Sequence, residues 1–245
     1  MNSRDFRDSL HQGAAQHGIW RTLPSDAMTE IIANAGYGFQ IFDLEHGALS
    51  LSEVQTMLRI NNARGRISFV RLGDKSSVAA QRALDAGAHG LVYPQINSAA
   101  EIALLAENLA FAPQGCRGFN PFVPAFGYGS QRVPHGPLPL FMPIIETQAG
   151  LDELGAICSH PSVDVVYFGA YDLSVQLGTP GDIQSPTVVS ALESATKICR
   201  EHDCAVGLMV NSDDAVKRWR DIGAQIFLHG VDGGILHKAF SLHSV

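Results

Sequence analysis

The chain has 245 residues, 46% of them hydrophobic and 17% charged, and this balance excludes an intrinsically disordered protein. Its formal net charge is -7 at pH 7 and no cluster of lysine and arginine is present, which argues against a nucleic-acid partner. No run of about 18 apolar residues and no signal-peptide pattern occurs, so we expect a cytoplasmic protein without a membrane partner.

Apolar stretches alternate with helix-like stretches along the chain. After an N-terminal helix, the pattern predicts strands at 18–23, 39–47, 66–74, 90–96, 140–145, 163–168, 205–210 and 224–230. It predicts helices at 26–35, 50–63, 77–86, 98–110 and 149–159, a helical pair across 172–202, and helices beginning at 211 or 212 and at 231. Eight continuously apolar strands followed by helices, with no G-x-G-x-x-G motif, favour a single-domain (β/α)₈ TIM barrel of the α/β class over an open doubly wound sheet.

One segment interrupts this alternation. Residues 111–139 contain six of the 12 prolines and several glycines, so they cannot form one regular element. Long irregular loops in compact domains are usually functional, and we expect this loop to cover the mouth of the site. The four cysteines show no C-x-x-C spacing, and we expect them to be reduced and buried.

Polar residues stand where several predicted strands end. They are Asp43, Glu45 and His46 after the second strand, Arg71 after the third, Glu146 after the fifth and Asp172 after the sixth. The carboxyl ends of parallel strands meet at one edge, so these side chains should converge there. Two carboxylates on rigid supports suit Mg²⁺ or Mn²⁺, although each acid could instead cap or begin a helix. The histidine and the arginine could likewise be structural.

Six segments occur in the order and spacing of the HpcH/HpaI aldolase family: FDLEHG, FVRLG, LDAGAHGLVYPQINSAAE, APQGCRG, IET and VDVVYFGAYDLS. The chain resembles that family, the metal-dependent class II pyruvate aldolases of the 4-hydroxy-2-oxoheptanedioate aldolase type, from about Gly18 to the final helix. The resemblance implies a (β/α)₈ barrel, a Mg²⁺, Mn²⁺ or Co²⁺ cofactor and a small 2-oxo acid substrate. It also implies a homohexamer built as a trimer of dimers that exchange their last helix.

Carried over by position, the resemblance assigns roles to particular residues. Glu146 and Asp172 become the metal ligands, and the backbone at Tyr171 and Asp172 receives the substrate carboxylate. His46 becomes the general base and Arg71 the cation that binds substrate and stabilises the enolate. Asp85 matches the acid that raises the basicity of the histidine, and Asp43 joins the catalytic group.

Two positions depart from the family pattern. Ile144 stands where the family usually has a substrate-contacting glutamine, so we count it among the substrate-binding positions while its contact differs. In the G-P-x-D motif, Ala170 replaces the proline.

The function implied is reversible aldol cleavage of a 4-hydroxy-2-oxo acid to pyruvate, or a related 2-oxo acid, and an aldehyde through a metal-bound enolate. The alternative in the same superfamily is a condensing enzyme or lyase acting on oxaloacetate or a CoA thioester, as in siderophore citrate synthases.

A Schiff-base route would require a lysine at a strand end, and Lys75 is the sole candidate. A non-catalytic protein that binds a sugar acid or a keto acid is a further alternative, but such a protein would need no base beside the two carboxylates.

Overall fold

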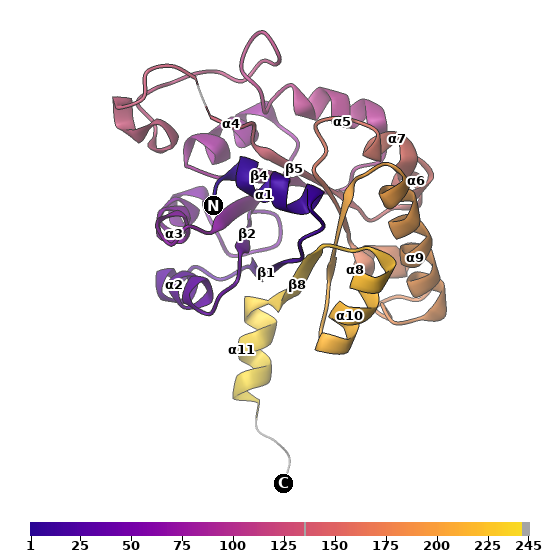
Figure 1. The fold of residues 1–245 in the computed structure, drawn as a ribbon. Coiled ribbons are helices and arrows are strands. Elements are labelled where there is room, and N and C mark those ends of the chain that lie inside the picture. The colour runs from indigo at the N-terminus through magenta and orange to yellow at the C-terminus, as the bar shows by residue number, and fades with distance from the viewer. Residues whose placement is uncertain (135, 242–245) are drawn as a thin grey trace.

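Eight short apolar stretches form the eight strands of one closed barrel. The computed structural model describes residues 1–134 and 136–241, and every strand pairs in parallel with the next in chain order (Figure 1). The strands are β1 (Gln16–Arg21), β2 (Phe39–Asp43), β3 (Ile67–Arg71), β4 (Gly90–Tyr93), β5 (Leu140–Ile145), β6 (Val165–Phe168), β7 (Ala205–Met209) and β8 (Ile226–Val231). The predicted (β/α)₈ barrel is confirmed.

Helices surround the barrel (Figure 1). They are α1 (Ser3–His11), α2 (Asp26–Asn34), α3 (Leu51–Ala63), α4 (Ser77–Asp85), α5 (Ala99–Ala106), the 3₁₀ helix η1 (Pro124–Gly129), α6 (Gln148–Asp152), α7 (Leu154–Cys158), α8 (Ala170–Gln176), α9 (Pro186–Glu201), α10 (Asp213–Ile222) and α11 (Asp232–Phe240). Serine side chains cap two of these helices, since Ser98 accepts from the backbone N–H of Glu101 and Ser212 from that of Ala215. The single helix predicted at 149–159 is two short helices that meet at Glu153.

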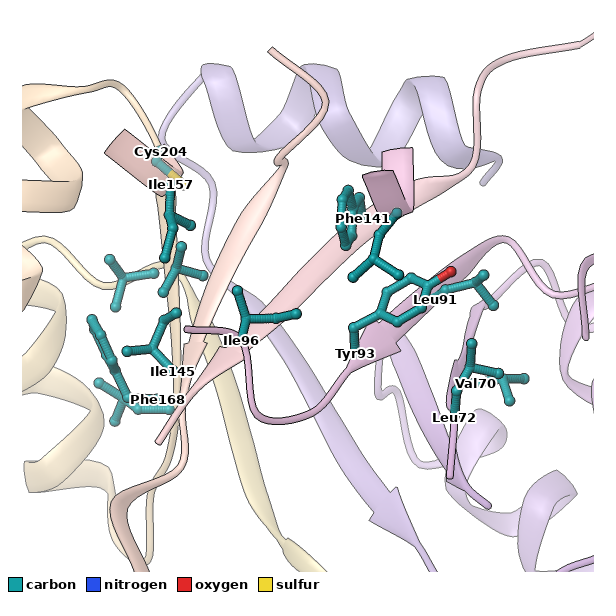
Figure 2. Packing of buried hydrophobic residues seen from close by; sticks show 14 of the residues in the cluster. Val70, Leu72, Leu91, Tyr93, Ile96, Phe141, Ile145, Ile157, Phe168 and Cys204 are labelled. Atoms are coloured by element: carbon teal, nitrogen blue, oxygen red, sulfur yellow. The ribbon is translucent and has the colours of Figure 1, made fainter. Parts of the chain in front are cut away.

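The strands separate two hydrophobic cores. Every residue of β2, β3, β4, β5 and β6 is buried, which explains why these strands are continuously apolar rather than alternating. Outward-facing side chains such as Leu91, Phe141 and Phe168 pack against the helices in the outer core (Figure 2). Inward-facing side chains such as Ile41 and Met142 fill the barrel itself.

Helix α1 lies across the N-terminal end of the barrel (Figure 1). Its Phe6 is fully buried in the inner core, and its ring meets those of Phe39 and Phe69 edge-on at centroid distances of 6.0 and 5.8 Å. Leu10 belongs to the same cluster. This end of the barrel is therefore closed by side chains of the first helix.

The irregular segment 111–139 packs on the outside of α4. Arg117 donates to the carboxylate of Asp85 at 3.0 Å and stacks over the ring of Phe111 at 4.7 Å. Phe126 of η1 is buried beside the same ring. Residue 135 lies outside the described residues. None of the described residues of this segment lines the cavity at the carboxyl ends of the strands, which is described below, so within one chain the segment does not cover the mouth of the site as predicted.

A buried ion pair joins α11 to β1. Arg21 is 0% exposed and its Nε donates to Asp232 at 2.8 Å, while the backbone N–H of Thr22 donates to the same carboxylate at 2.9 Å. Beyond this attachment α11 extends away from the barrel and exposes Ile235 and Phe240 (Figure 1).

Two further predictions concern the state of the cysteines and the absence of a membrane-spanning segment. All four cysteines are free, and burial is confirmed for Cys158, Cys199 and Cys204, whereas Cys116 is exposed. Within residues 1–134 and 136–241, no helix combines the length and hydropathy required to cross a bilayer.

Candidate active site

The carboxyl ends of the strands enclose a cavity of about 270 Å³. The predicted site residues that line it are Asp43, His46, Arg71, Ile144, Glu146, Tyr171 and Asp172. A hollow of about 870 Å³ lies at the opposite end, but its Arg7 is paired with Asp164 at 3.1 Å, and active sites of (β/α)₈ enzymes lie at the carboxyl ends of the strands. We therefore assign the chemistry to the smaller cavity.

Asp43 holds Arg71 in a fixed orientation. The last residues of β2 and β3 are register partners, and the Arg71 Nε donates to Asp43 Oδ1 at 2.8 Å while Nη2 donates to Oδ2. Asp43 also accepts from the backbone N–H groups of Glu45 and His46 at 2.8 and 3.1 Å. Burial raises the pKa of Asp43, but hydrogen bonds from Arg71 and other donors outweigh it, so the pKa lies below its ordinary value. Asp43 is thus an ionised anchor rather than a free base.

Trp20 is a site residue that the sequence analysis missed. Its indole Nε1 donates to Asp43 at 3.0 Å, and its ring lies 4.7 Å from the Arg71 guanidinium carbon. Trp20 lies on β1 and is 5% exposed. A buried tryptophan in an apolar strand reads as core from sequence, and only the closure of the barrel brings it beside the arginine.

Glu146 is a buried acid with one carboxylate oxygen already satisfied. It directly follows β5, is 7% exposed, and its Oε1 accepts from the backbone N–H of Gln95 at 2.7 Å. Gly169 permits the close approach of the other oxygen, because a Cβ there would lie 2.7 Å from Oε2. Burial, joined by the charges of Asp172 and Glu45, raises the pKa of Glu146 to about 7.

This pair of carboxylates fits a divalent metal. Glu146 and Asp172 line the same cavity, and the charge of Asp172 adds to burial in raising the pKa of Glu146. In the described ranges, 1–134 and 136–241, no group of three or more His, Cys, Asp or Glu suited to a metal is found. Glu146 and Asp172 could together supply two hard oxygen ligands, which suits Mg²⁺ or Mn²⁺ because these ions take one or two carboxylates and complete their shells with water and substrate oxygens.

His46 lies at the exposed lip of the cavity. Its side chain is 69% exposed, and its Nε2 lies 3.8 Å from Glu45 Oε2. That same Glu45 oxygen is buried and lies 3.0 Å from Arg71 Nη1. An imidazole in this position can reach both solvent and a bound ligand.

Two further predictions fall outside the cavity. Asp85 is the last residue of α4 and is paired with Arg117, so the structure does not bring it to His46 within one chain. Helices of a (β/α)₈ barrel run back toward the N-terminal end, which explains why the end of α4 is far from the strand ends. Lys75 donates to the backbone oxygen of Gln95 at 2.7 Å and pairs with Glu101 at 2.9 Å, and it is not among the cavity residues.

The family model described as HpcH/HpaI aldolase/citrate lyase matches residues 16–239, which span the whole barrel. The chain belongs to this family. Its resemblance to the HpcH/HpaI aldolases is therefore confirmed, and the family is one of aldolases and lyases.

Two aldolases and a citrate synthase are among the proteins similar to this chain. The chain is 29% identical to a hydroxypyruvate/pyruvate aldolase of Roseovarius nubinhibens, over 93% of this chain and 90% of that protein. It is 30% identical to a 4-hydroxy-2-oxo-heptane-1,7-dioate aldolase of Klebsiella pneumoniae, over 95% of this chain and 89% of that protein. The solved structure of the citrate synthase SbnG has a TM-score of 0.83 at 25% identity, covering 95% of this chain and 93% of that one.

Proposed function

We propose that this protein is a divalent-metal-dependent lyase that reversibly cleaves a 4-hydroxy-2-oxo acid to pyruvate, or a related 2-oxo acid, and an aldehyde. The observation that carries the proposal is the buried Glu146 carboxylate beside Asp172, with its pKa raised to about 7, in a cavity that also holds Arg71 and His46. Perturbed acids grouped with a base and a cation in one cleft are typical of catalytic sites. Relatives named as aldolases of hydroxypyruvate and pyruvate and of a 4-hydroxy-2-oxo acid support the substrate class.

Glu146 and Asp172 would hold Mg²⁺, Mn²⁺ or Co²⁺. When bound, the cation would supply Lewis acidity toward the keto oxygen and the carboxylate of the substrate. The backbone at Tyr171 and Asp172, at the lip of the cavity, would receive that carboxylate.

The protein's own side chains handle the proton and the developing charge. His46 accepts the proton of the 4-hydroxyl group as the C3–C4 bond breaks. The bonding electron pair moves to C3, the C4 oxygen becomes the carbonyl of the aldehyde, and C3 then takes a proton to give the methyl group of pyruvate. Arg71, kept in place by Asp43 and Trp20, stabilises the enolate charge that forms in this step.

Exchange of the methyl protons of pyruvate tests this assignment without knowledge of the aldehyde. In D₂O the protein should exchange these protons, measured by proton NMR, when Mg²⁺, Mn²⁺ or Co²⁺ is present but not in EDTA. An Arg71→Lys variant should exchange them far more slowly. Absence of exchange with all three metals, together with absence of pyruvate release from a panel of 4-hydroxy-2-oxo acids, would overturn the proposal.

A second candidate is a condensing enzyme that joins oxaloacetate to a CoA thioester. It is favoured by the likeness to the citrate synthase SbnG. Oxaloacetate plus acetyl-CoA separates the two functions, because condensation followed by thioester hydrolysis releases a free CoA thiol, which a thiol reagent detects. An aldolase releases none.

We propose two further properties: a homohexamer, which the resemblance implies, and a cytoplasmic location. The hexamer should be a trimer of dimers. Sedimentation velocity on the purified protein measures the mass of the assembly, which should be that of six chains.

A further inference from the structure

Lys75 is a charged residue near the cavity that the proposed reaction does not use. It lies in the loop between β3 and α4 and does not line the cavity. Its Nζ donates to the backbone oxygen of Gln95 at 2.7 Å and pairs with Glu101 at 2.9 Å. The side chains of this ion pair are 32% and 33% exposed, and a pair of this exposure adds little to stability. The contact with Gln95, by contrast, leads toward the cavity.

Gln95 has a left-handed backbone conformation, with a φ of 53°. Residues other than glycine rarely adopt this conformation, because the Cβ atom makes it unfavourable. The N–H of Gln95 donates to Glu146 Oε1 at 2.7 Å, and its carbonyl oxygen accepts from Lys75 and from Asn97 Nδ2, the latter at 2.9 Å. One backbone unit therefore joins Lys75 to a proposed metal ligand.

The residue after Gln95 is fixed in place. The N–H of Ile96 donates to the backbone oxygen of Ile144 at 3.2 Å, and its side chain is 0% exposed in the outer core (Figure 2). With Ile96 fixed, a change in the φ of Gln95 would turn the N–H of Gln95 away from Glu146. The direction of this N–H therefore depends on the contacts that keep φ positive.

Three side chains form a closed set of hydrogen bonds around the Gln95 carbonyl oxygen, and we call Lys75, Asn97 and Glu101 the Gln95 clamp. Lys75 and Asn97 donate to this oxygen. Glu101 accepts from the N–H of Asn97 at 2.7 Å through Oε2 and from Lys75 through Oε1. Lys75 supplies the charged donor of the clamp, and charged donors form stronger hydrogen bonds than neutral ones.

We propose that Lys75 is a positioning residue for the metal site. It holds the backbone of Gln95 in its unfavourable conformation, so that the N–H of Gln95 keeps the Glu146 carboxylate oriented for a divalent ion. The inference rests on the proposed function, in which Glu146 and Asp172 hold the ion, and it adds a residue outside the cavity. Hydrogen-bond partners behind the ligands of a metal commonly set its affinity.

A direct effect of the lysine charge would have the opposite sign. Removing a cation near a site for a divalent ion lowers electrostatic repulsion and should strengthen binding of the ion. Loss of the orientation of Glu146 should weaken it. The sign of the change in metal affinity therefore separates the two effects.

The test measures the Kd of Mn²⁺ by isothermal titration calorimetry, on full-length protein freed of metal with EDTA and then dialysed. Lys75→Met should raise the Kd by about 10-fold. Lys75→Arg should restore most of the affinity, because a guanidinium can still donate to the carbonyl oxygen. The Tm of both variants without metal should stay close to that of the wild type.

Arg64→Met is the matched control, since it removes an exposed ion pair with Glu30 at the end of α3. It should leave the Kd of Mn²⁺ unchanged. An unchanged or lower Kd in Lys75→Met, or an equal increase in Arg64→Met, would overturn the inference.

A second background tests the route through the backbone. Glycine adopts a positive φ without the penalty that glutamine pays, so Gln95→Gly should depend less on the clamp. Lys75→Met should then raise the Kd of Mn²⁺ by a smaller factor in Gln95→Gly than in the wild type. Equal factors in the two backgrounds would refute a role for the conformation of Gln95.

The wild-type titration distinguishes the two levels of failure. If the wild type binds Mn²⁺ and Lys75→Met binds it equally well, the inference falls and the proposed function stands. If the wild type binds none of Mn²⁺, Mg²⁺ and Co²⁺, the metal-dependent function falls and the inference falls with it.

Discussion

Replacement of Glu146 by glutamine should stabilise the metal-free protein while abolishing its activity. Glu146 is 7% exposed, and burial together with the charges of Asp172 and Glu45 raises its pKa from 4.5 to about 7. A carboxylate with a raised pKa binds its proton more tightly in the folded state than in the unfolded state. Stability therefore falls as the pH rises from about 4.5 to about 7, and the full penalty persists above pH 7.

The magnitude follows from the size of the shift. The difference between 4.5 and about 7, at 1.36 kcal/mol per pKa unit, corresponds to a penalty of about 3 kcal/mol at pH 8 and about 1 kcal/mol at pH 5. Glutamine removes the charge and keeps an oxygen that can accept from the N–H of Gln95. For a chain of this length, about 3 kcal/mol raises the Tm by roughly 6–12 °C.

Thermal unfolding by circular dichroism checks this result. The wild type and Glu146→Gln are compared in EDTA at pH 8 and at pH 5, and both are then measured with Mn²⁺ at pH 8. We expect the Tm of the variant to exceed that of the wild type by roughly 6–12 °C at pH 8 and by only about 2–4 °C at pH 5. The variant should not respond to Mn²⁺, which should stabilise the wild type. A variant that is less stable than the wild type in EDTA at pH 8 would show that the reasoning about the buried charge is wrong.

Three other substitutions test the fold and the site. Asp232→Ala leaves the buried guanidinium of Arg21 without its partner and should lower the free energy of unfolding by about 3–5 kcal/mol, measured in urea. Tyr93→Phe removes a buried hydroxyl that has no hydrogen-bond partner in the described residues (Figure 2), so the free energy of unfolding should rise by about 1 kcal/mol in the same titration; a loss of stability would point to a hidden partner. Arg71→Lys cannot reproduce the two hydrogen bonds to Asp43 and should reduce the exchange rate of pyruvate by about 100-fold while the Tm changes little.

The barrel could be predicted from sequence because each strand is buried on both faces and therefore reads as an uninterrupted apolar run. Convergence of Asp43, Arg71, Glu146 and Asp172 followed from one rule, that parallel strands end at the same edge. That rule depends only on the order of strands and helices, so the convergence of these residues could be predicted without knowing the side-chain contacts.

The misses share a physical origin, since each concerns a contact that the order of the elements does not specify. Trp20 reads as core until the curved sheet brings its ring against Arg71 at the end of β3. Ile183, which also lines the cavity, lies in a loop with no sequence pattern of its own. The hydrogen bond from Gln95 to the Glu146 carboxylate is donated by a backbone N–H, which every residue other than proline has, so the sequence does not predict it. Asp85 was carried over by position alone, and its place at the end of α4 sets it against Arg117.

Phe6 and Leu10 of α1 fill the N-terminal end of the barrel, so in the described residues the cavity opens at the carboxyl ends of the strands. In the proposed reaction, the product that lies nearest to this opening would leave the cavity first. The aldehyde produced by cleavage would leave before pyruvate, whose escape route it blocks. Release is thereby ordered, and pyruvate should compete with the substrate for the empty enzyme, whereas the aldehyde should not.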